Sequence, residues 1–299
     1  MTHLIANRLL ASGCTDVGSV RTLNEDNYRI SQEAGVLIVA DGMGGHDAGE
    51  VASAHVIEMM MDYLSRPLPD DEEVTIVNAP GLRAADPEAP TIVAGEEDLW
   101  NTDDIDTLES VASTSSWKQL SQQLIKQVGD AIVHTNEKIN EINQERGYYD
   151  GSGMGSTLVG LWMPPGFSRA VVFHVGDSRL YLMRAGEGLK RVTQDHTLYQ
   201  QWLDFGSQGR PPAQNVILQA MGPVEQVVPD IQLHLLSPGD RVLLCTDGLT
   251  GMIGDDLIEE QLRGLQRDNL DQVCRHLIEL AKKQGGKDNI TVIVGLVTD

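Results

Sequence analysis

The chain has 299 residues, a net charge of −22 and a pI of about 4.6, so its surface is strongly acidic. This charge disfavours nucleic acids and anionic membranes as partners, because phosphate groups require a basic face. A hydrophobic content of 41% predicts a globular protein. No apolar run approaches the ~20 residues that a membrane span needs.

The cysteines, Cys14, Cys245 and Cys274, are odd in number and widely spaced. Cys245 also falls within a predicted strand. A disulfide framework is therefore not expected, and a cytoplasmic location is predicted.

The N-terminal part begins with a predicted strand pair, followed by the apolar strand Val36–Ala40. This strand leads into Asp41 and a glycine-rich loop over residues 42–49. A helix is predicted from Glu50 to Leu64, because apolar side chains recur there on one broad face.

Residues 66–116 differ from the rest of the chain, because they contain 13 acidic residues, two basic residues and five prolines. Their net charge of −11 is half that of the whole chain. This composition predicts a flexible acidic insert. A long helix from Trp117 to Arg146 follows, with Ser115 or Ser116 as the predicted N-cap.

The C-terminal half alternates between groups of strands and groups of helices, without strict β-α-β order. Strands are predicted at 156–163, 169–175, 179–184, 242–246 and 290–297, helices at 256–264 and 270–284, and a flap at 197–215. This order predicts a single domain over residues 1–299, built as a mostly antiparallel α+β sandwich.

Single aspartates adjoin four of the predicted apolar strands: Asp41, Asp177, Asp247 and Asp288. Carboxylates brought together at strand ends repel one another unless a cation lies between them. Without a His/Cys cluster, the oxygen ligands favour Mg²⁺ or Mn²⁺ over Zn²⁺. The segment 21–27 adds Arg21, whose guanidinium suits phosphate, and two further carboxylates.

Simpler interpretations compete with this one. Asp41 and Asp247, taken singly, are typical of Asp-Gly turns. His174 lies in an apolar strand and is expected to be a hydrogen-bonded core histidine. The segment 151–155 is expected to be a turn rather than a phosphate loop, because no helix follows it.

Seven ordered segments closely resemble the PPM family, the type 2C metal-dependent serine/threonine phosphatases, and its bacterial branch in particular. They are Gly18–Arg21 with Asn24–Asn27, Val39–His46, Gly155–Thr157, Val175–Arg179, Asp195–Thr197, Thr246–Thr250 and Lys287–Thr291.

The resemblance implies a four-layer α-β-β-α sandwich of two antiparallel sheets flanked by helices. It further implies two Mn²⁺ or Mg²⁺ ions and a weaker third, and hydrolysis by direct attack of a metal-bridging hydroxide. The implied roles are metal bridging by Asp41, further ligation by the Gly42 carbonyl, Asp247 and Asp288, ordering of metal-bound water by Glu25 and Asp26, third-metal binding by Asp177, and phosphate binding by Arg21.

Two positions depart from the family pattern. Met43 stands where some members carry a histidine thought to protonate the leaving group, which makes His46 the candidate catalytic acid here. Gly251 replaces an acid that supports the third metal in many members, so tight binding of that metal is in doubt.

The leading function is therefore hydrolysis of phosphoserine and phosphothreonine in proteins by a monomeric enzyme that opposes a serine/threonine kinase. A small-molecule phosphatase and a catalytically silent binding module on the same fold are the alternatives.

Overall fold

The computed structural model describes residues 3–5, 8–44, 48–66, 111–149, 151–165, 167 and 169–298. The strands are β1 His3–Ile5, β2 Leu9–Asp16, β3 Asp26–Ser31, β4 Val36–Met43, β5 Gly155–Ser156, β6 Leu158–Trp162, β7 Arg169–Val175, β8 Arg179–Met183, β9 Leu189–Arg191, β10 Asp230–Leu235, β11 Arg241–Cys245 and β12 Ile290–Val297. The helices are α1 Ala48–Leu64, α2 Val111–Glu145, α3 Leu198–Asp204, α4 Asp247–Thr250, α5 Asp255–Arg263 and α6 Leu270–Lys283.

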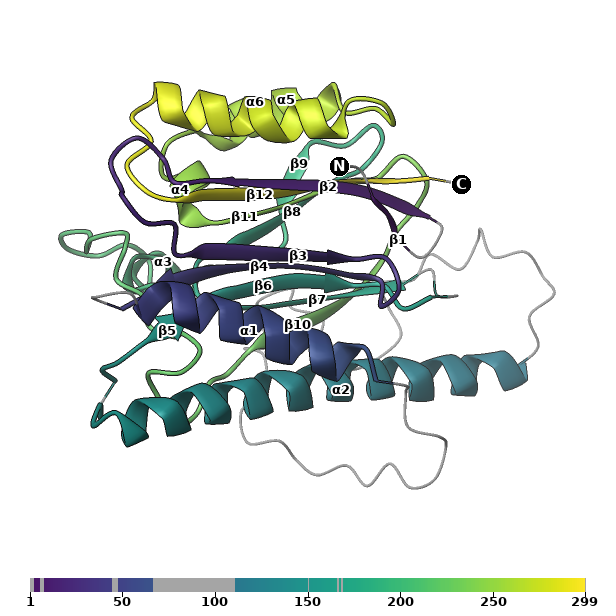
Figure 1. The fold of residues 1–299 in the computed structure, drawn as a ribbon. Helices are drawn as coiled ribbons and strands as arrows, with labels where there is room; N and C mark the ends of the chain where they lie inside the picture. The colour runs from purple at the N-terminus through teal and green to yellow at the C-terminus, as the bar shows by residue number, and fades with distance from the viewer. Residues whose placement is uncertain are drawn as a thin grey trace.

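Two antiparallel sheets pack face to face and are covered by helices on both outer faces (Figure 1). One sheet has the strand order β1-β2-β12-β11-β8-β9, and the other has the order β10-β7-β6-β4-β3 with β5 paired to β4. Helices α5 and α6 cover the first sheet, and α1 and α2 cover the second. The predicted α-β-β-α sandwich is confirmed.

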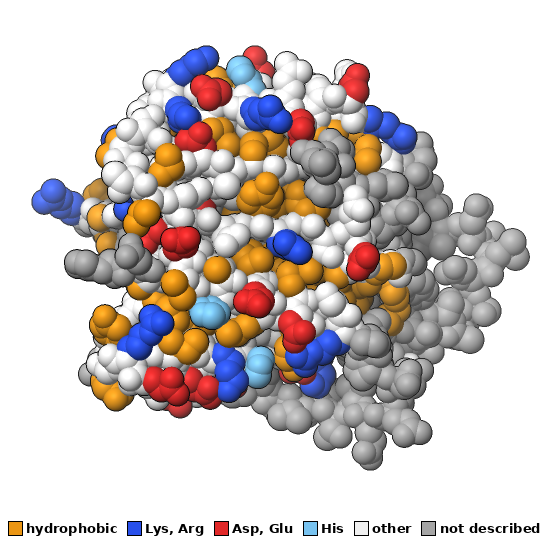
Figure 2. Space-filling view, in the orientation of Figure 1, with side chains coloured by type: hydrophobic (Ala, Val, Ile, Leu, Met, Phe, Trp, Pro, Cys, Tyr) orange, Lys and Arg blue, Asp and Glu red, His pale blue; other side chains and the backbone are white. Residues whose placement is uncertain are grey.

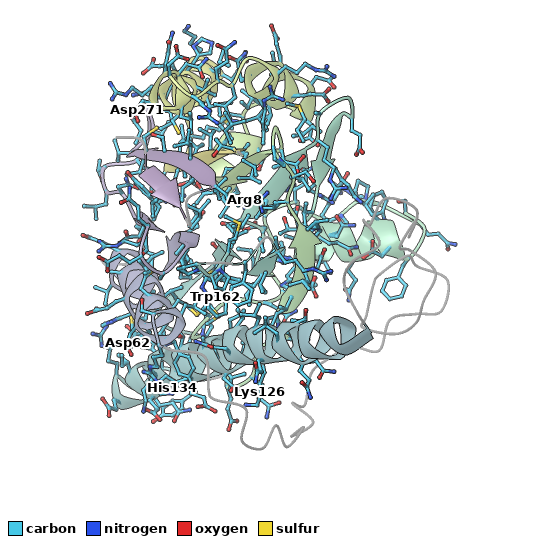
Figure 3. The ribbon with its side chains drawn as sticks, turned by 90° about the vertical axis from the view of Figure 1, so that its right-hand side faces the viewer. Arg8, Asp62, Lys126, His134, Trp162 and Asp271 are labelled. Atoms are coloured by element: carbon cyan, nitrogen blue, oxygen red, sulfur yellow. The ribbon has the colours of Figure 1, made fainter. Side chains whose placement is uncertain are left out.

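Three apolar layers hold the sandwich together, one between the sheets and one under each helical layer (Figure 3). Successive side chains of a strand point to opposite faces. Val36 and Ile38 of β4 accordingly pack toward α1 and α2, whereas Leu37 packs toward the other sheet. Both faces of the central strands are buried, which is why they appear in the sequence as continuous apolar runs rather than as an alternating pattern.

Several elements differ from the sequence-based prediction. Helix α2 begins at Val111, so Ser115 and Ser116 lie inside it and neither is the N-cap. Strand β4 continues to Met43, because Gly42 and Met43 pair with β5. Strands β9 and β10 and the short helix α4 were not predicted. Most of the predicted acidic insert, residues 67–110, lies outside the described residues.

One end of the sandwich gathers the connections that carry the candidate site residues. The β2–β3 connection, the α6–β12 connection, α3 and α4 all lie at this end (Figure 1). On the face shown in Figure 2, described acidic and basic side chains are interspersed. Within the described residues, no helix is long and apolar enough to cross a membrane.

Candidate active site

Asp41 and Asp26 face each other on the paired strands β4 and β3. The backbone N–H of Asp41 donates to Thr157 Oγ1 at 3.0 Å, and its carbonyl accepts from Thr157 N at 2.8 Å. The next residue must be glycine, because a Cβ at Gly42 would lie 2.0 Å from the Gly49 carbonyl oxygen. Strand pairing and this close approach to α1 thus fix the Asp41 backbone.

Asp247 brings a carboxyl group from the opposite sheet. It is the first residue of α4, separated from the end of β11 by one residue, and its charge is among the causes that raise the pKa of Asp41. The preceding Thr246 donates its Oγ1–H to Asp26 Oδ2 at 2.9 Å and accepts from Thr291 N at 3.0 Å. Thr246 therefore connects the two sheets directly below the carboxylates.

Arg21 and Asp288 meet at the open side of this cluster. Arg21 Nη2 lies 2.8 Å from Asp288 Oδ2, and both side chains are about half exposed. Asn289 holds their two loops together, because its Oδ1 accepts from Glu25 N at 2.8 Å and its Nδ2 donates to the Leu23 carbonyl at 2.8 Å. The structure thus brings together residues separated by more than 260 positions in the sequence.

The electrostatics of the cluster are unfavourable without a cation. Burial is the main cause that raises the pKa of Asp26 and of Asp177 to about 7, and neighbouring carboxylates add to it. Burial and four surrounding aspartates raise the pKa of Asp41 well above its usual range. Among the described residues, Asp26 Oδ1 and Asp177 Oδ1 are buried without a hydrogen-bond partner. An all-oxygen donor set with unsatisfied buried acceptors fits a hard divalent cation.

Asp177 is positioned by a short clamp on the residue before it. Gly176 has a φ of +108°, and a Cβ there would lie 2.7 Å from Thr157 Cγ2. Its N–H donates to His196 Nδ1 at 3.2 Å, and its carbonyl accepts from His196 N at 2.9 Å. His196 therefore fixes the peptide that precedes the carboxylate.

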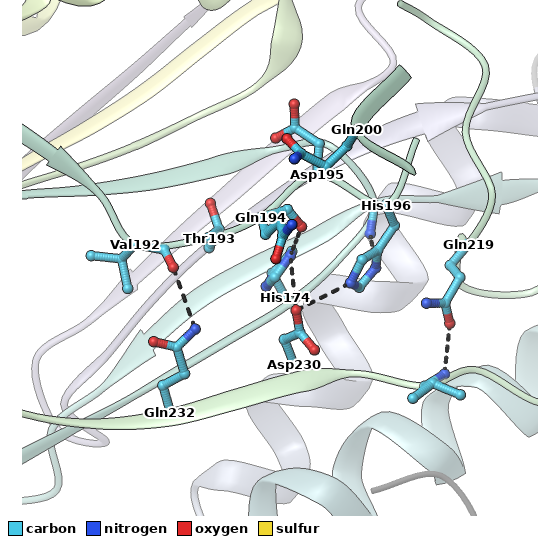
Figure 4. Close-up of polar contacts among 12 residues, drawn as sticks. His174, Val192, Thr193, Gln194, Asp195, His196, Gln200, Gln219, Asp230 and Gln232 are labelled. Atoms are coloured by element: carbon cyan, nitrogen blue, oxygen red, sulfur yellow. Dashed lines mark hydrogen bonds and ion pairs between the residues drawn. The ribbon is translucent and has the colours of Figure 1, made fainter. Parts of the chain in front are cut away.

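A second polar cluster, formed by His174, His196 and Asp230, lies beside this clamp (Figure 4). Its potential ligand atoms lie within 4.8 Å of one another, but the hydrogen-bond partners of the two rings assign a proton to each Nε2. His174 Nε2 donates to the Gln194 carbonyl at 2.8 Å. His196 Nδ1 accepts from Gly176, so its Nε2 carries the proton and faces Asp230 Oδ2 at 3.4 Å. These bonds define a structural network rather than a metal centre.

His174 confirms the predicted core histidine, since its side chain is only 1% exposed and is hydrogen-bonded. Burial, together with His196, lowers its pKa to about 4, which keeps the ring neutral. The positioning roles of Thr157, His196 and Asn289 were not predicted. They lie within the recognised motifs, but their contacts span distant parts of the chain.

The predicted flap begins with α3 and is tied at its base. Thr197 and Ile217 form an isolated bridge, and Leu198 N donates to the Val216 carbonyl at 2.9 Å. Arg179 forms a bidentate pair with Asp195 just before the flap, at 2.9 and 2.6 Å. His46, the predicted catalytic acid, lies outside the described residues.

The comparisons with known proteins agree with this arrangement. A family model described as Protein phosphatase 2C matches residues 19–292. The serine/threonine phosphatase stp of Listeria monocytogenes is 31% identical over 288 residues, which cover 94% of this chain and 92% of the relative. The serine/threonine protein phosphatase PstP of Mycobacterium tuberculosis is 32% identical over 291 residues, which cover 95% of this chain and 44% of the relative.

Solved structures show the same fold. The Mycobacterium tuberculosis phosphatase PstP/Ppp superposes with a TM-score of 0.71 at 29% identity, covering 98% of this chain and 100% of that one. The catalytic domain of PstP, solved in complex with two manganese ions, gives a TM-score of 0.69 at 30% identity, covering 98% of this chain and 99% of that one.

A sandwich of two antiparallel sheets, flanked by helices and with aspartates clustered at one end, defines the PPM class of phosphatase folds. The chain belongs to the protein phosphatase 2C family and groups with its bacterial members.

Proposed function

We propose that this chain is a metal-dependent protein phosphatase that hydrolyses phosphoserine and phosphothreonine. The observation that carries the proposal is the carboxylate cluster in which Asp26 and Asp177 are buried and Asp41 and Asp247 are half-buried, with Asp288 at its open side. Its carboxylates come from both sheets and require cations to coexist in ionised form at neutral pH.

The proposed metal set takes its residue roles from the family resemblance and is supported by the clustering of the aspartates. Asp41 would bridge two Mn²⁺ or Mg²⁺ ions, together with the Gly42 carbonyl, Asp247 and Asp288, while Glu25 and Asp26 order water. Asp177 would hold a weaker third ion. When bound, these ions supply Lewis acidity toward the phosphoryl oxygens and activate the attacking water.

Arg21 is the proposed phosphate-binding residue. Its guanidinium is about half exposed and already pairs with Asp288, so it lies at the open side of the cluster. A guanidinium binds two phosphoryl oxygens at once and stabilises negative charge that develops on them. The ion pair with Asp288 orients Arg21 toward the proposed metals.

Direct attack by water is proposed, and the environment of Cys245 argues against a phosphoenzyme formed on this cysteine. Cys245 lies two residues before Asp247, at the end of β11. Its side chain is fully buried, and burial raises the pKa of its thiol to about 12. A protonated, inaccessible thiol is a poor nucleophile.

A phosphorylated protein that a serine/threonine kinase has modified is the proposed substrate. The flap offers an exposed apolar contact for such a substrate, since the side chain of Phe205 is 77% exposed. A monomeric state and a cytoplasmic location stay predictions.

The test is release of phosphate from a phosphothreonine peptide and from a set of sugar phosphates, with and without Mn²⁺. We expect metal-dependent turnover of the peptide and a far lower kcat/KM for the sugar phosphates. The Asp247→Asn variant is the matched control and should be inactive on both. Preference for a sugar phosphate would indicate a small-molecule phosphatase. p-Nitrophenyl phosphate serves as a general substrate, and its lack of turnover would indicate a silent binding module.

A further inference from the structure

Two cysteines outside the candidate site lie together between β2 and α6. Cys14 is on β2 and Cys274 is on α6, and both are free thiols. They belong to the same apolar cluster between the first sheet and its helices. The proposed phosphatase chemistry uses neither of them.

The Cys274 thiol packs against β2 next to Cys14. Its Sγ donates to the carbonyl of Ser12, which lies two residues before Cys14 on the same strand, at 3.0 Å. The interaction with Cys274, aided by Arg275, lowers the pKa of Cys14. The same interaction and burial raise the pKa of Cys274 well above its usual range. The proton is therefore lost first from Cys14.

The exposure of the two thiols also favours Cys14 as the group that is oxidised first. Cys14 is half-buried, whereas Cys274 is 1% exposed. Cys14 is therefore the more accessible of the two to a small oxidant. An accessible thiol with a lowered pKa next to a buried thiol is the arrangement in which one cysteine is oxidised and the other resolves the product.

Cys245 provides an internal comparison. Both Cys14 on β2 and Cys245 on β11 lie opposite Val292 of the intervening strand β12. Two strand spacings separate these cysteines by about 10 Å, which is too far for a disulfide. The only partner within reach of Cys14, among the described residues, is Cys274.

We propose that Cys14 and Cys274 form a redox-active dithiol, the site of a reversible disulfide between β2 and α6 that is generated by a peroxide. Cys14 Sγ attacks one peroxide oxygen, the O–O bond breaks, and a sulfenic acid and one water molecule form. Cys274 Sγ then attacks the Cys14 sulfur, so that the S–S bond forms, the S–O bond breaks and a second water molecule leaves. The two thiols lose two electrons and two protons, and hydrogen peroxide is reduced to two water molecules.

The disulfide would cross-link two elements that already contact each other near the active-site loops. Lys282 Nζ of α6 lies 2.9 Å from Asp16 Oδ2 of β2, and Ser19 N donates to the Gly286 carbonyl at 2.7 Å. The bond would close a loop that spans most of the chain, so it should stabilise the folded protein. We expect the melting temperature of the oxidised protein to rise by several degrees.

Peptide mapping tests this assignment in the full chain. Trypsin cleaves after Lys and Arg, which places the three cysteines in separate peptides, 9–21, 242–263 and 268–275. After treatment with hydrogen peroxide and alkylation of the remaining thiols, we expect peptide 9–21 linked to peptide 268–275 and an alkylated Cys245. Dithiothreitol should release the link, and the variant Cys245→Ala should still form it.

Two further variants keep the test decisive. Cys274→Ala should trap a sulfenic acid on Cys14, which dimedone labels, and Cys14→Ser should leave Cys274 alkylated and abolish the rise in melting temperature. Circular dichroism establishes that each variant is folded. Sulfinic acid at Cys14 of the wild-type protein with a free Cys274, or a link between two chains on a non-reducing gel, would overturn the proposal.

Discussion

Two partly buried polar clusters adjoin the Gly176–Asp177 segment, and they differ in how their polar atoms are satisfied. In the carboxylate cluster, Asp26 Oδ1 and Asp177 Oδ1 have no partner among the described residues. In the histidine cluster, the ring nitrogens of His196 and Nε2 of His174 are hydrogen-bonded or face a carboxylate. Unsatisfied buried acceptors indicate a site for a ligand, whereas satisfied ones indicate a structural element.

Asp41→Ala should give the largest effect, because it removes the central carboxylate of the unsatisfied cluster. We expect kcat to fall by about 10³-fold or more, since metal-centred stabilisation of a transition state amounts to several kcal/mol. Phosphate release at saturating Mn²⁺ measures this, with circular dichroism as the control for folding. A variant that retains more than about a tenth of wild-type kcat would contradict the bridging role.

Arg21→Ala should weaken substrate binding by about 2 kcal/mol, or about 30-fold in kcat/KM, through loss of charge-assisted hydrogen bonds. Mn²⁺ affinity should not fall, because Arg21 supplies no ligand atom and its loss frees Asp288 from an ion pair. Steady-state kinetics with a phosphopeptide, together with calorimetric titration of Mn²⁺, separate these two quantities. Unchanged kcat and KM would show that Arg21 does not bind phosphate.

In the metal-free protein, the free energy of unfolding should fall as pH rises from about 4 to about 7. The pKa values of Asp26 and Asp177 are raised to about 7, against about 3.9 in an unfolded chain. Between these values the folded state binds more protons than the unfolded state, so the free energy of unfolding decreases with increasing pH.

Thermal melts of chelated protein at about pH 5 and about pH 7.5 measure this effect, and added Mn²⁺ should restore stability at the higher pH. Asp26→Asn should show a smaller decrease, because one of the titrating groups is removed. A melting temperature that rises over this pH interval in the chelated protein would contradict the sign.

His196→Ala tests the satisfied cluster. It removes the acceptor for Gly176 N–H and the donor that faces Asp230. We expect a loss of about 1–3 kcal/mol in the free energy of unfolding and a smaller loss of activity than in Asp41→Ala. Urea denaturation and kinetics compare the two variants, with the exposed His276→Ala as the control. An equal loss of activity in His196→Ala and Asp41→Ala would place His196 in the reaction itself.

Gly251→Asp should have the smallest effect. Gly251 has a φ of −72°, and a Cβ there would meet only the Asp247 carbonyl at 3.0 Å, so a side chain needs a slight adjustment. An added carboxylate contributes about 1 kcal/mol to cation binding, which corresponds to about fivefold higher activity at limiting Mn²⁺. The neutral Gly251→Asn should leave the titration unchanged. Identical curves for all three proteins would show that residue 251 does not face the site.

The fold was largely predictable, because its central strands are buried on both faces. Strand β12, for example, is buried at every position and appears in the sequence as an apolar run interrupted only by Thr291 and Gly295. The start of α2 was not predictable, since residues 111–116 share the polar composition of the segment before them. The short helix that begins at Asp247 was not predicted, because an Asp-Gly pair is more typical of turns.

The candidate site was predictable only in its charged residues. Aspartates next to apolar runs are visible in the sequence, whereas the groups that hold them act over long separations. Thr157 lies 116 residues from Asp41, and Asn289 lies 264 residues from Glu25. Residue type and spacing do not encode such contacts, which arise when the sheets assemble.

The place of β12 in the middle of the first sheet has a consequence for biosynthesis. This strand pairs with both β2 and β11, and Asp288 directly precedes it. The ribosome synthesises β2 early, but β2 cannot pair with β12 until β12 itself has been synthesised. Nascent chains that end before Asp288 lack this aspartate, Asn289 and the whole of β12, so we expect premature termination there to yield products without phosphatase activity.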